Sequence, residues 1–157
     1  MTAKNIVVAT DLSEASAPAL RSAVELGAAL GASVTLLHVL EPPPTPPGLE
    51  AFALEGLPVD WEERLLRGRA LAAQERVAQL AKTASTEQVT VSPRMVTGLL
   101  PDSLVAEIKA NGYDLLVVGS HGRTGVAHFF LGSVAEKLVR NAPCPVLVVR
   151  PHSGHAR

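Results

Sequence analysis

Apolar runs and amphipathic stretches alternate along the 157-residue chain. Four short runs are almost continuously apolar, as expected for strands buried on both faces, and a fifth alternates between apolar and polar residues. In chain order the five predicted strands are residues 5–9, 33–39, 88–96, 113–118 and 145–150, of which 88–96 is the alternating one. The stretches between them carry apolar residues at helical spacing. The pattern predicts an α/β protein with a parallel sheet and helices on both of its faces.

Start and stop signals mark the predicted helices. Ser16 followed by Pro18 predicts an N-cap with proline in the first turn, and Gly31 predicts the end of that helix. Asp60 and Glu63 have the spacing of a capping box before a second helix, in which Glu63 can pair with Arg67 one turn later.

Two shorter helices are expected further on, one around Leu104 and Ile108 and one over residues 134–139. The first of these should end at Asn111-Gly112. Prolines crowd residues 42–47, where they can continue neither a sheet nor a helix, so a long surface loop is expected there. The length suits one domain, residues 1–151 with a variable proline-rich loop at 41–58, followed by a short tail at 152–157.

Composition narrows the function classes. The net charge of −1 argues against a basic nucleic-acid-binding face, and no apolar stretch approaches the length of a membrane span. The single cysteine, Cys144, leaves no internal disulfide and no multi-cysteine zinc site. A strand begins within the first few residues, which leaves no room for a signal peptide, so a cytoplasmic location is expected.

Glycines directly behind the fourth predicted strand carry the strongest functional signal. Gly119-Ser120-His121-Gly122 follows the apolar run, and Gly132-Ser133 comes nine residues later, where the last helix should begin. Backbone amides at such a strand-to-helix position can approach a phosphate chain. Other nucleotide and hydrolase signatures are missing: the sequence has no P-loop lysine motif, no Gly-x-Gly-x-x-Gly, no Gly-x-Ser-x-Gly and no His-Glu-x-x-His.

Taken together, these segments resemble the universal stress protein family, in its ATP-binding branch. The resemblance spans nearly the whole chain and rests on four segments besides the glycine motif. They are Ile-Val-Val-Ala-Thr-Asp-Leu-Ser ending at Ser13, Leu-Leu-His-Val ending at Val39, Asp-Leu-Leu-Val-Val beginning at Asp114, and Cys-Pro-Val-Leu-Val-Val beginning at Cys144. The resemblance implies an open, Rossmann-like sheet of the adenine nucleotide alpha hydrolase type, with strand order 3-2-1-4-5.

The resemblance also implies a ligand site between strands one and four. Asp11 would lie near the adenosine end, and Val39 would contact adenine through its backbone. Residues Val118 to Gly122, with Gly119 and His121 among them, would line the ribose and phosphates. Gly132, Ser133 and Val134 would hold the phosphates at the start of the last helix. The ligand implied is ATP, with Mg²⁺ or Mn²⁺ bound through the phosphates, and no catalytic residue is assigned.

The residues themselves leave alternatives open. Ser133 and Glu136 have capping-box spacing, so the hydroxyl of Ser133 could serve only its own helix. Asp11 could be an ordinary loop acid, and His121 a solvated loop residue. His38, inside a predicted strand, is interpreted as a satisfied core or interface residue.

Function is expected to be regulatory, with at most slow ATP hydrolysis. One rival is a structural or partner-binding module with an empty crevice, and another is an adenylate-transferring enzyme, although its Ser-Gly-Gly-x-Asp type of loop is missing. The last strand, Val146–Val149, is apolar on both faces, and an apolar strand at a sheet edge favours self-pairing. A homodimer through this strand is therefore expected, and replacing Val148 with lysine should give monomers.

Overall fold

A computed structural model describes residues 3–43, 60–120 and 131–150 of the chain. Most of the proline-rich loop, His121, Gly122 and the tail at 152–157 lie outside the described residues. Within them, no helix is both long and apolar enough to cross a membrane.

The strands form a five-stranded parallel sheet in the order β3-β2-β1-β4-β5, which confirms the predicted architecture. In chain order they are β1 (Asn5–Thr10), β2 (Ser33–Leu40), β3 (Val91–Thr97), β4 (Leu115–Gly119) and β5 (Val146–Val149). The alternating strand β3 lies at one edge, as its pattern indicates. Its Pro93 is tolerated there because an edge strand leaves one row of amides unpaired.

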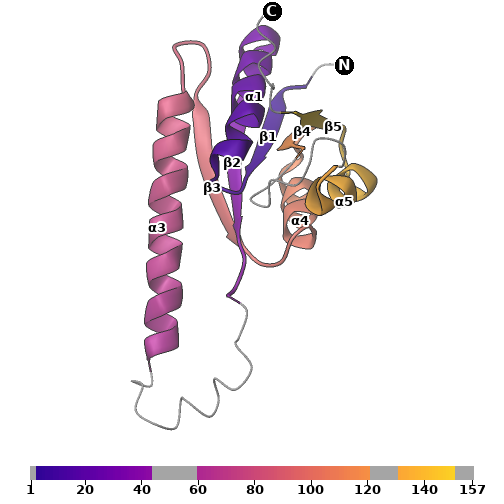
Figure 1. Ribbon diagram of the computed structural model, residues 1–157. Coiled ribbons are helices and arrows are strands. Elements are labelled where there is room, and N and C mark those ends of the chain that lie inside the picture. The colour runs from indigo at the N-terminus through magenta and orange to yellow at the C-terminus, as the bar shows by residue number, and fades with distance from the viewer. Residues whose placement is uncertain (1–2, 44–59, 121–130, 151–157) are drawn as a thin grey trace, which may run out of the picture.

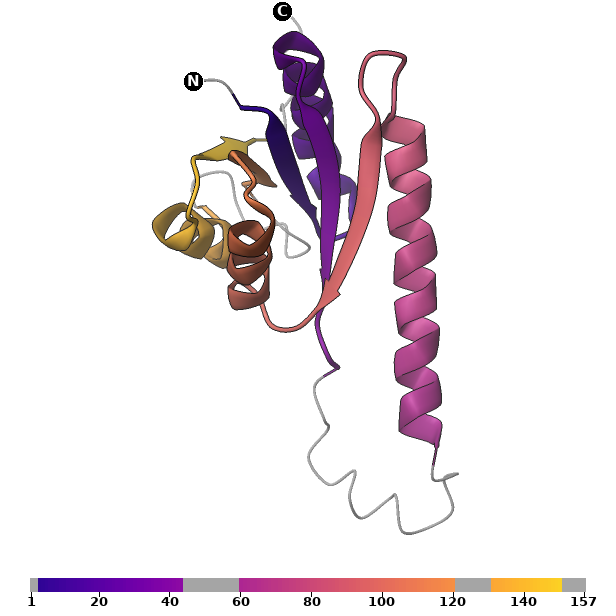
Figure 2. The ribbon, with the colours of Figure 1, turned by 180° about the vertical axis from the view of Figure 1, so that it is seen from behind.

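Helices cover both faces of the sheet (Figures 1 and 2). A short 3₁₀ turn, η1 (Glu14–Ser16), leads into α1 (Ala17–Leu30), which packs with α3 (Trp61–Ala84) on one face. Helices α4 (Asp102–Asn111) and α5 (Ser133–Asn141) pack on the other face. The winding therefore reverses between β1 and β4, which are neighbours in the sheet.

Strand alternation divides the core into two clusters. On the first face Ile6 and Val8 of β1 pack with Ala23 of α1 and Val77 of α3. On the second face Val7 packs with side chains of β2, α4, β4 and α5. Among the described residues helices pack on both faces of the sheet, which leaves the ends of the strands accessible to a ligand. Cys144 packs half-buried against the second cluster, and burial raises the pKa of its thiol.

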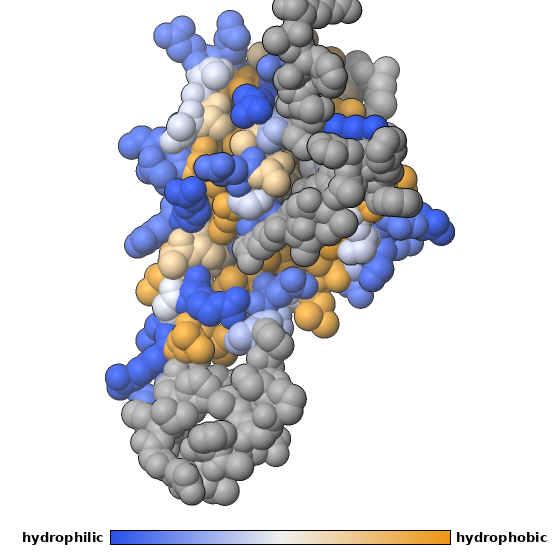
Figure 3. Space-filling view, viewed as in Figure 1, coloured by the Kyte–Doolittle hydropathy of each residue, from blue (hydrophilic) through white to orange (hydrophobic). Residues whose placement is uncertain are grey.

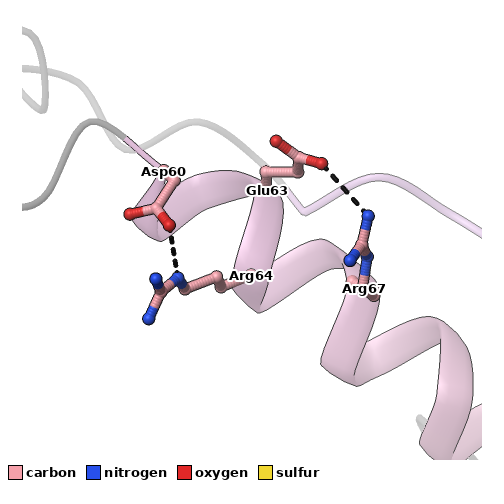
Figure 4. Close-up of polar contacts among 4 residues, drawn as sticks. All are labelled: Asp60, Glu63, Arg64 and Arg67. Atoms are coloured by element: carbon pink, nitrogen blue, oxygen red, sulfur yellow. Dashed lines mark hydrogen bonds and ion pairs between the residues drawn. The ribbon is translucent and has the colours of Figure 1, made fainter.

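Glycine stop signals are confirmed, since Gly31 and Gly112 end α1 and α4 with φ of 63° and 61°. The capping box predicted at the start of α3 is wrong. Asp60 occupies the N-cap position, but its carboxylate pairs with Arg64 instead of a helix amide (Figure 4). The predicted pair of Glu63 and Arg67 is present at 3.3 Å between Oε1 and Nη2 (Figure 4).

Helix α3 extends beyond the carboxyl ends of the strands (Figures 1 and 2). Its buried residues, Ala73, Val77 and Ala81, all lie in its C-terminal half. Leu65 and Leu66 in the projecting half are exposed, and apolar residues reach the surface along this part of the molecule (Figure 3). The projecting half therefore lies beyond the carboxyl ends of β2 and β3, the strands that α3 contacts (Figures 1 and 2).

Candidate functional site

The seam between β1 and β4 opens toward the carboxyl ends of the two strands. Their pairing runs only from Ile6–Leu115 to Val8–Val117, although β1 continues to Thr10 and β4 to Gly119. By contrast, β1 pairs with β2 along its whole length. A crevice therefore begins where the winding reverses, which is the position at which open α/β sheets bind ligands.

A cavity of about 550 Å³ occupies this crevice. That volume lies within the range typical of sites for small ligands. Its lining comes from the ends of β1, β2 and β4, from α4, from the start of α5 and from the projecting part of α3. The residues that carry the argument below are Thr10, Asp11, Ser16, His38, Val39, Arg69, Leu100, Leu104, Val118, Gly119, Ser120, Gly132, Ser133 and Val134.

The turn after β1 is fixed by its own side chains. Thr10 Oγ1 accepts a hydrogen bond from the Leu12 amide at 3.0 Å and lies 2.8 Å from Ser16 Oγ. Because the hydroxyl of Ser16 donates to the Ser13 carbonyl at 2.8 Å, the proton between the two hydroxyls belongs to Thr10. Both hydroxyls are buried and hydrogen-bonded, so the polar groups of this turn are satisfied without a ligand.

Asp11 begins an Asx turn on the same wall. Its Oδ1 accepts hydrogen bonds from the amide of Ser13 at 3.0 Å and from the Ser13 hydroxyl at 2.6 Å. Leu12, between them, has a φ of 64°, a left-handed conformation that costs a residue other than glycine about 1 kcal/mol. The Thr10 bond to its amide and the packing of Leu12 against the first core cluster hold the turn in this conformation.

The start of α5 forms the opposite wall. Gly132 is the N-cap residue, and its amide donates to the Ser120 carbonyl at 2.8 Å, which ties the helix start to the end of β4. The first intrahelical bond runs from the Glu136 amide to the Gly132 carbonyl. The amides of Ser133, Val134 and Ala135 therefore have no partner within the helix, and all three residues line the cavity. This wall is suited to an anion.

The alternative left open for Ser133, a capping box with Glu136, is not formed. Ser133 is the first helical residue, not the N-cap, and the Glu136 carboxylate pairs with Arg140 at 2.9 Å. The hydroxyl of Ser133 is therefore not used in a box with Glu136. Ser133 is exposed and lies on the cavity wall.

Seven of the predicted site residues lie together around this cavity. They are Asp11, Val39, Val118, Gly119, Gly132, Ser133 and Val134. The other two, His121 and Gly122, lie outside the described residues. Sequence reasoning did not select Thr10, Ser16, Leu100, Leu104 or Arg69, which also line the cavity. Thr10 could have been selected from the sequence, because it is the last residue of a buried strand whose carboxyl end lies at the switch point.

The opposite end of the β1–β4 seam is closed by Asp114. Its Oδ2 accepts hydrogen bonds from the backbone amides of Lys4 at 2.8 Å and Asn5 at 2.9 Å. These two amide bonds lower the pKa of Asp114 from its ordinary value of 3.8. The carboxylate thus joins the two strands just before their regular pairing begins.

Within the described ranges no three His, Cys, Asp or Glu side chains are grouped as a metal site would require.

The fold and the cavity define a doubly wound α/β protein with a cavity at its topological switch point. The model of the universal stress protein family matches residues 2–150. A universal stress protein of Methanocaldococcus jannaschii is 32% identical over 151 residues, covering 94% of this chain and 82% of the relative. The chain belongs to the universal stress protein family.

Solved structures of this family share the fold. The universal stress protein UspA from Lactobacillus plantarum has a TM-score of 0.77 and 24% identity, covering 96% of this chain and 99% of that one. A universal stress protein in complex with cAMP has a TM-score of 0.62 and 25% identity, covering 98% of this chain and 100% of that one.

Proposed function

We propose that the cavity binds ATP and that the protein is a nucleotide-dependent regulator with at most slow hydrolysis. The observation that carries the proposal is the start of α5, where three amides without helical partners face a cavity at the switch point. The family relative in complex with cAMP supports an adenine nucleotide as the ligand class.

The two ends of the cavity differ in the way that a nucleotide requires. The amides of Ser133, Val134 and Ala135 suit the phosphates, and His121 and Gly122 are proposed to complete this end. Val39, Leu100 and Leu104 give the end near β2 an apolar character that suits a purine. Val118, Gly119 and Asp11 would lie between them, beside the ribose.

The expected affinity follows from these contacts. A micromolar site needs about −8 kcal/mol. Three or four amide bonds to charged oxygens contribute about 1.5–3 kcal/mol each, and purine burial adds to them. Mg²⁺ or Mn²⁺ would offset the remaining phosphate charge, since Arg69 is the only lysine or arginine among the described lining residues.

Binding rather than fast turnover is the expected activity. Phosphoryl transfer needs a positioned nucleophile and strong charge clamping around the phosphates. The carboxylate of Asp11, one of the described lining residues, is poorly placed to activate a nucleophile at the phosphates. It lies on the β1 wall, across the crevice from α5, and its Oδ1 already accepts hydrogen bonds from Ser13. Single-turnover hydrolysis of bound ATP should therefore be slower than about 1 s⁻¹, the lower end of ordinary enzyme rates.

Calorimetric titration of the nucleotide-free protein with Mg²⁺–ATP tests the proposal directly. Saturable heat with a micromolar to submillimolar Kd is expected. Mass spectrometry of nucleotide released from the freshly purified, denatured protein identifies the ligand independently. If millimolar ATP gives no heat and no nucleotide co-purifies, the cavity is not an ATP site. The alternative of a structural or partner-binding module is then favoured.

A homodimer through β5 is the second part of the proposal. β5 occupies an edge of the sheet, and Leu147 on it is 36% exposed. An apolar edge strand is stabilised by antiparallel pairing with a second copy. Val148 is a poor position for a test, because its side chain packs against the second core cluster and lysine there would also destabilise the fold.

Leu147→Lys is the better variant, because it places a charge on the exposed part of the edge. Light scattering should give a dimer for the parent protein and a monomer for Leu147→Lys. Leu30→Lys, at an exposed leucine on α1, is the matched control and should remain dimeric. A dimeric mass for both variants would show that the dimer does not form through β5.

A further inference from the structure

The sheet has two edge strands, β3 and β5, which differ in length and in the backbone groups that they expose. β3 has seven residues and β5 has four, so β3 is the longer of the two edges. Ser92, Pro93 and Arg94 in the middle of β3 are exposed, so no described element covers this part of the edge. An uncovered edge strand ordinarily serves as a template to which another strand can pair.

Only alternate amides of β3 face away from the sheet. The Gly98 amide, directly after the strand, donates to the Leu40 carbonyl on β2 at 3.1 Å. Because successive amides of a strand point to opposite sides, the amides at even-numbered positions of β3 also face β2. The amides at odd-numbered positions therefore face outward, and the location of Pro93 agrees with this, because proline in an edge strand occupies an outward-facing position.

The first half of this outward row is already closed. Pro93 has no amide hydrogen to donate. The Val91 amide donates to Ser85 Oγ at 3.0 Å, and the Ser85 hydroxyl is itself held by a hydrogen bond to a carbonyl of α3 at 2.9 Å. The outward amides that remain in β3 are those of Met95 and Thr97, within its last three residues.

We propose that Pro93 and Ser85 close the β3 edge to strand addition, so that the sheet is extended only at β5. This inference rests on the β5 dimer proposed above for its end point. In that dimer both β5 strands are used, and the two β3 strands form the outer edges of the joined sheet. An open β3 would pair with β3 or β5 of further copies, and pairing between unlike edges continues without closing. Closure of β3 therefore ends assembly at two copies.

Pro93→Thr tests the closure, because threonine suits a strand and restores an amide at an outward position. In sedimentation velocity over a concentration series the parent mass should not rise beyond the dimer. The folded Pro93→Thr variant should reach at least about twice the parent mass. Adding Ser85→Ala, which frees the Val91 amide, should raise the mass further at the same concentration. Circular dichroism and thermal unfolding verify that each variant is folded at the temperature of the measurement.

Two further variants separate an opened edge from a general increase in strand propensity. Ser92→Thr makes the neighbouring exposed residue β-branched, but the amide there already faces β2, so the parent mass should be kept. Pro93→Thr combined with Thr97→Pro moves the proline to another exposed, outward-facing position of β3. This variant should return to the parent mass.

The outcomes separate this inference from the proposed function. A parent mass that rises beyond the dimer, a folded Pro93→Thr variant with the parent mass, or equal growth in Ser92→Thr would each overturn the closed β3 edge. If the parent protein is a monomer, the proposed β5 dimer fails, whereas a higher mass for Pro93→Thr than for that monomer would still support the closed edge. Should the variant with Ser85→Ala not fold, Pro93→Thr alone decides.

Discussion

The two ends of the β1–β4 seam differ in whether their backbone amides have hydrogen-bond partners. At the amino end the Asp114 carboxylate accepts hydrogen bonds from the amides of Lys4 and Asn5 and so joins the two strands. At the carboxyl end the pairing stops at Val8 and Val117, and the amides that begin α5 have no partner within the helix. The same pair of strands is thus held together at one end and separated at the other.

The difference indicates that the closed end contributes to stability, and it supports the ligand site proposed at the open end. Within the open end the β1 turn is already satisfied through Thr10 and Ser16, whereas the first amides of α5 have no partner within their helix. Substitutions at the closed end and in the β1 turn should change stability. Substitutions at the α5 wall should change nucleotide affinity.

The largest effect is expected from Gly132→Asp. A carboxylate at the N-cap should stabilise α5 by about 0.5–1 kcal/mol, because it interacts favourably with the helix dipole. The same charge faces the phosphates, and repulsion of about 3–4 kcal/mol at close range should weaken ATP binding by at least about 100-fold.

Gly132→Asn is the matched control, since it caps the helix without a charge and should weaken binding far less. Thermal unfolding and calorimetry measure the two effects separately. Equal loss of affinity in the two variants would show that side-chain bulk at residue 132, not charge, controls the site.

Thr10→Val should act mainly on stability. Valine keeps the shape but leaves the Leu12 amide and the Ser16 hydroxyl without the bonds that Thr10 makes to them. Loss of these bonds in a buried turn should lower the free energy of unfolding by about 1–3 kcal/mol, measured by urea titration. The folded variant should bind ATP within a few fold of the parent. A large loss of affinity with unchanged stability would reverse the roles assigned to the two walls.

Ser133→Ala should show the opposite pattern with a smaller effect. The hydroxyl is not engaged with Glu136, so its removal should change the free energy of unfolding by less than about 0.5 kcal/mol. Loss of one hydrogen bond to a phosphate should weaken ATP binding by about 5- to 20-fold in calorimetry. Ser22→Ala, on α1, is a control that should leave both quantities unchanged. Unaltered affinity in Ser133→Ala would show that the hydroxyl does not bind the phosphates and that only the backbone amides of α5 can do so.

Asp114→Asn tests the closed end and its dependence on pH. The pKa of Asp114 is lowered in the folded protein, so its contribution is complete above the ordinary value of 3.8 and is lost as the pH falls through the lowered folded pKa. Parent and variant should therefore differ in urea midpoint at pH 7 and converge in strong acid. ATP affinity at pH 7 should be unaffected. A difference that persists or grows in acid would contradict the role of the carboxylate.

Most of the fold could be predicted because it depends on local patterns. Buried strands leave apolar runs, and Gly31 and Gly112 mark helix ends where a left-handed residue is needed. The order of the strands came only from the family resemblance, since periodicity does not say which strands are neighbours. The capping box predicted at Asp60 is not formed because its carboxylate pairs with Arg64 one turn later. The alternative box at Ser133 is not formed because Ser133 is the first helical residue, and Glu136 pairs with Arg140.

The candidate site was less predictable than the fold. Gly132 and Ser133 could be selected because their motif is local, and Asp11 because it ends a strand. Leu100, Leu104 and Arg69 reach the cavity from elements distant in sequence, and nothing local to them indicates it. His38 was interpreted as a satisfied residue, and the hydrogen bond between its Nδ1 and the Thr10 carbonyl shows its partner.

Helix α3 has two mechanically different halves. Amides near Ala73, Val77 and Ala81 are anchored on the sheet and should exchange with deuterium only when the whole domain unfolds. Amides of the projecting half, where Leu65 and Leu66 are exposed, should exchange orders of magnitude faster through fraying. Arg69, the residue of α3 that lines the cavity, lies between these two halves, so exchange at its amide should report where the anchored part of the helix ends.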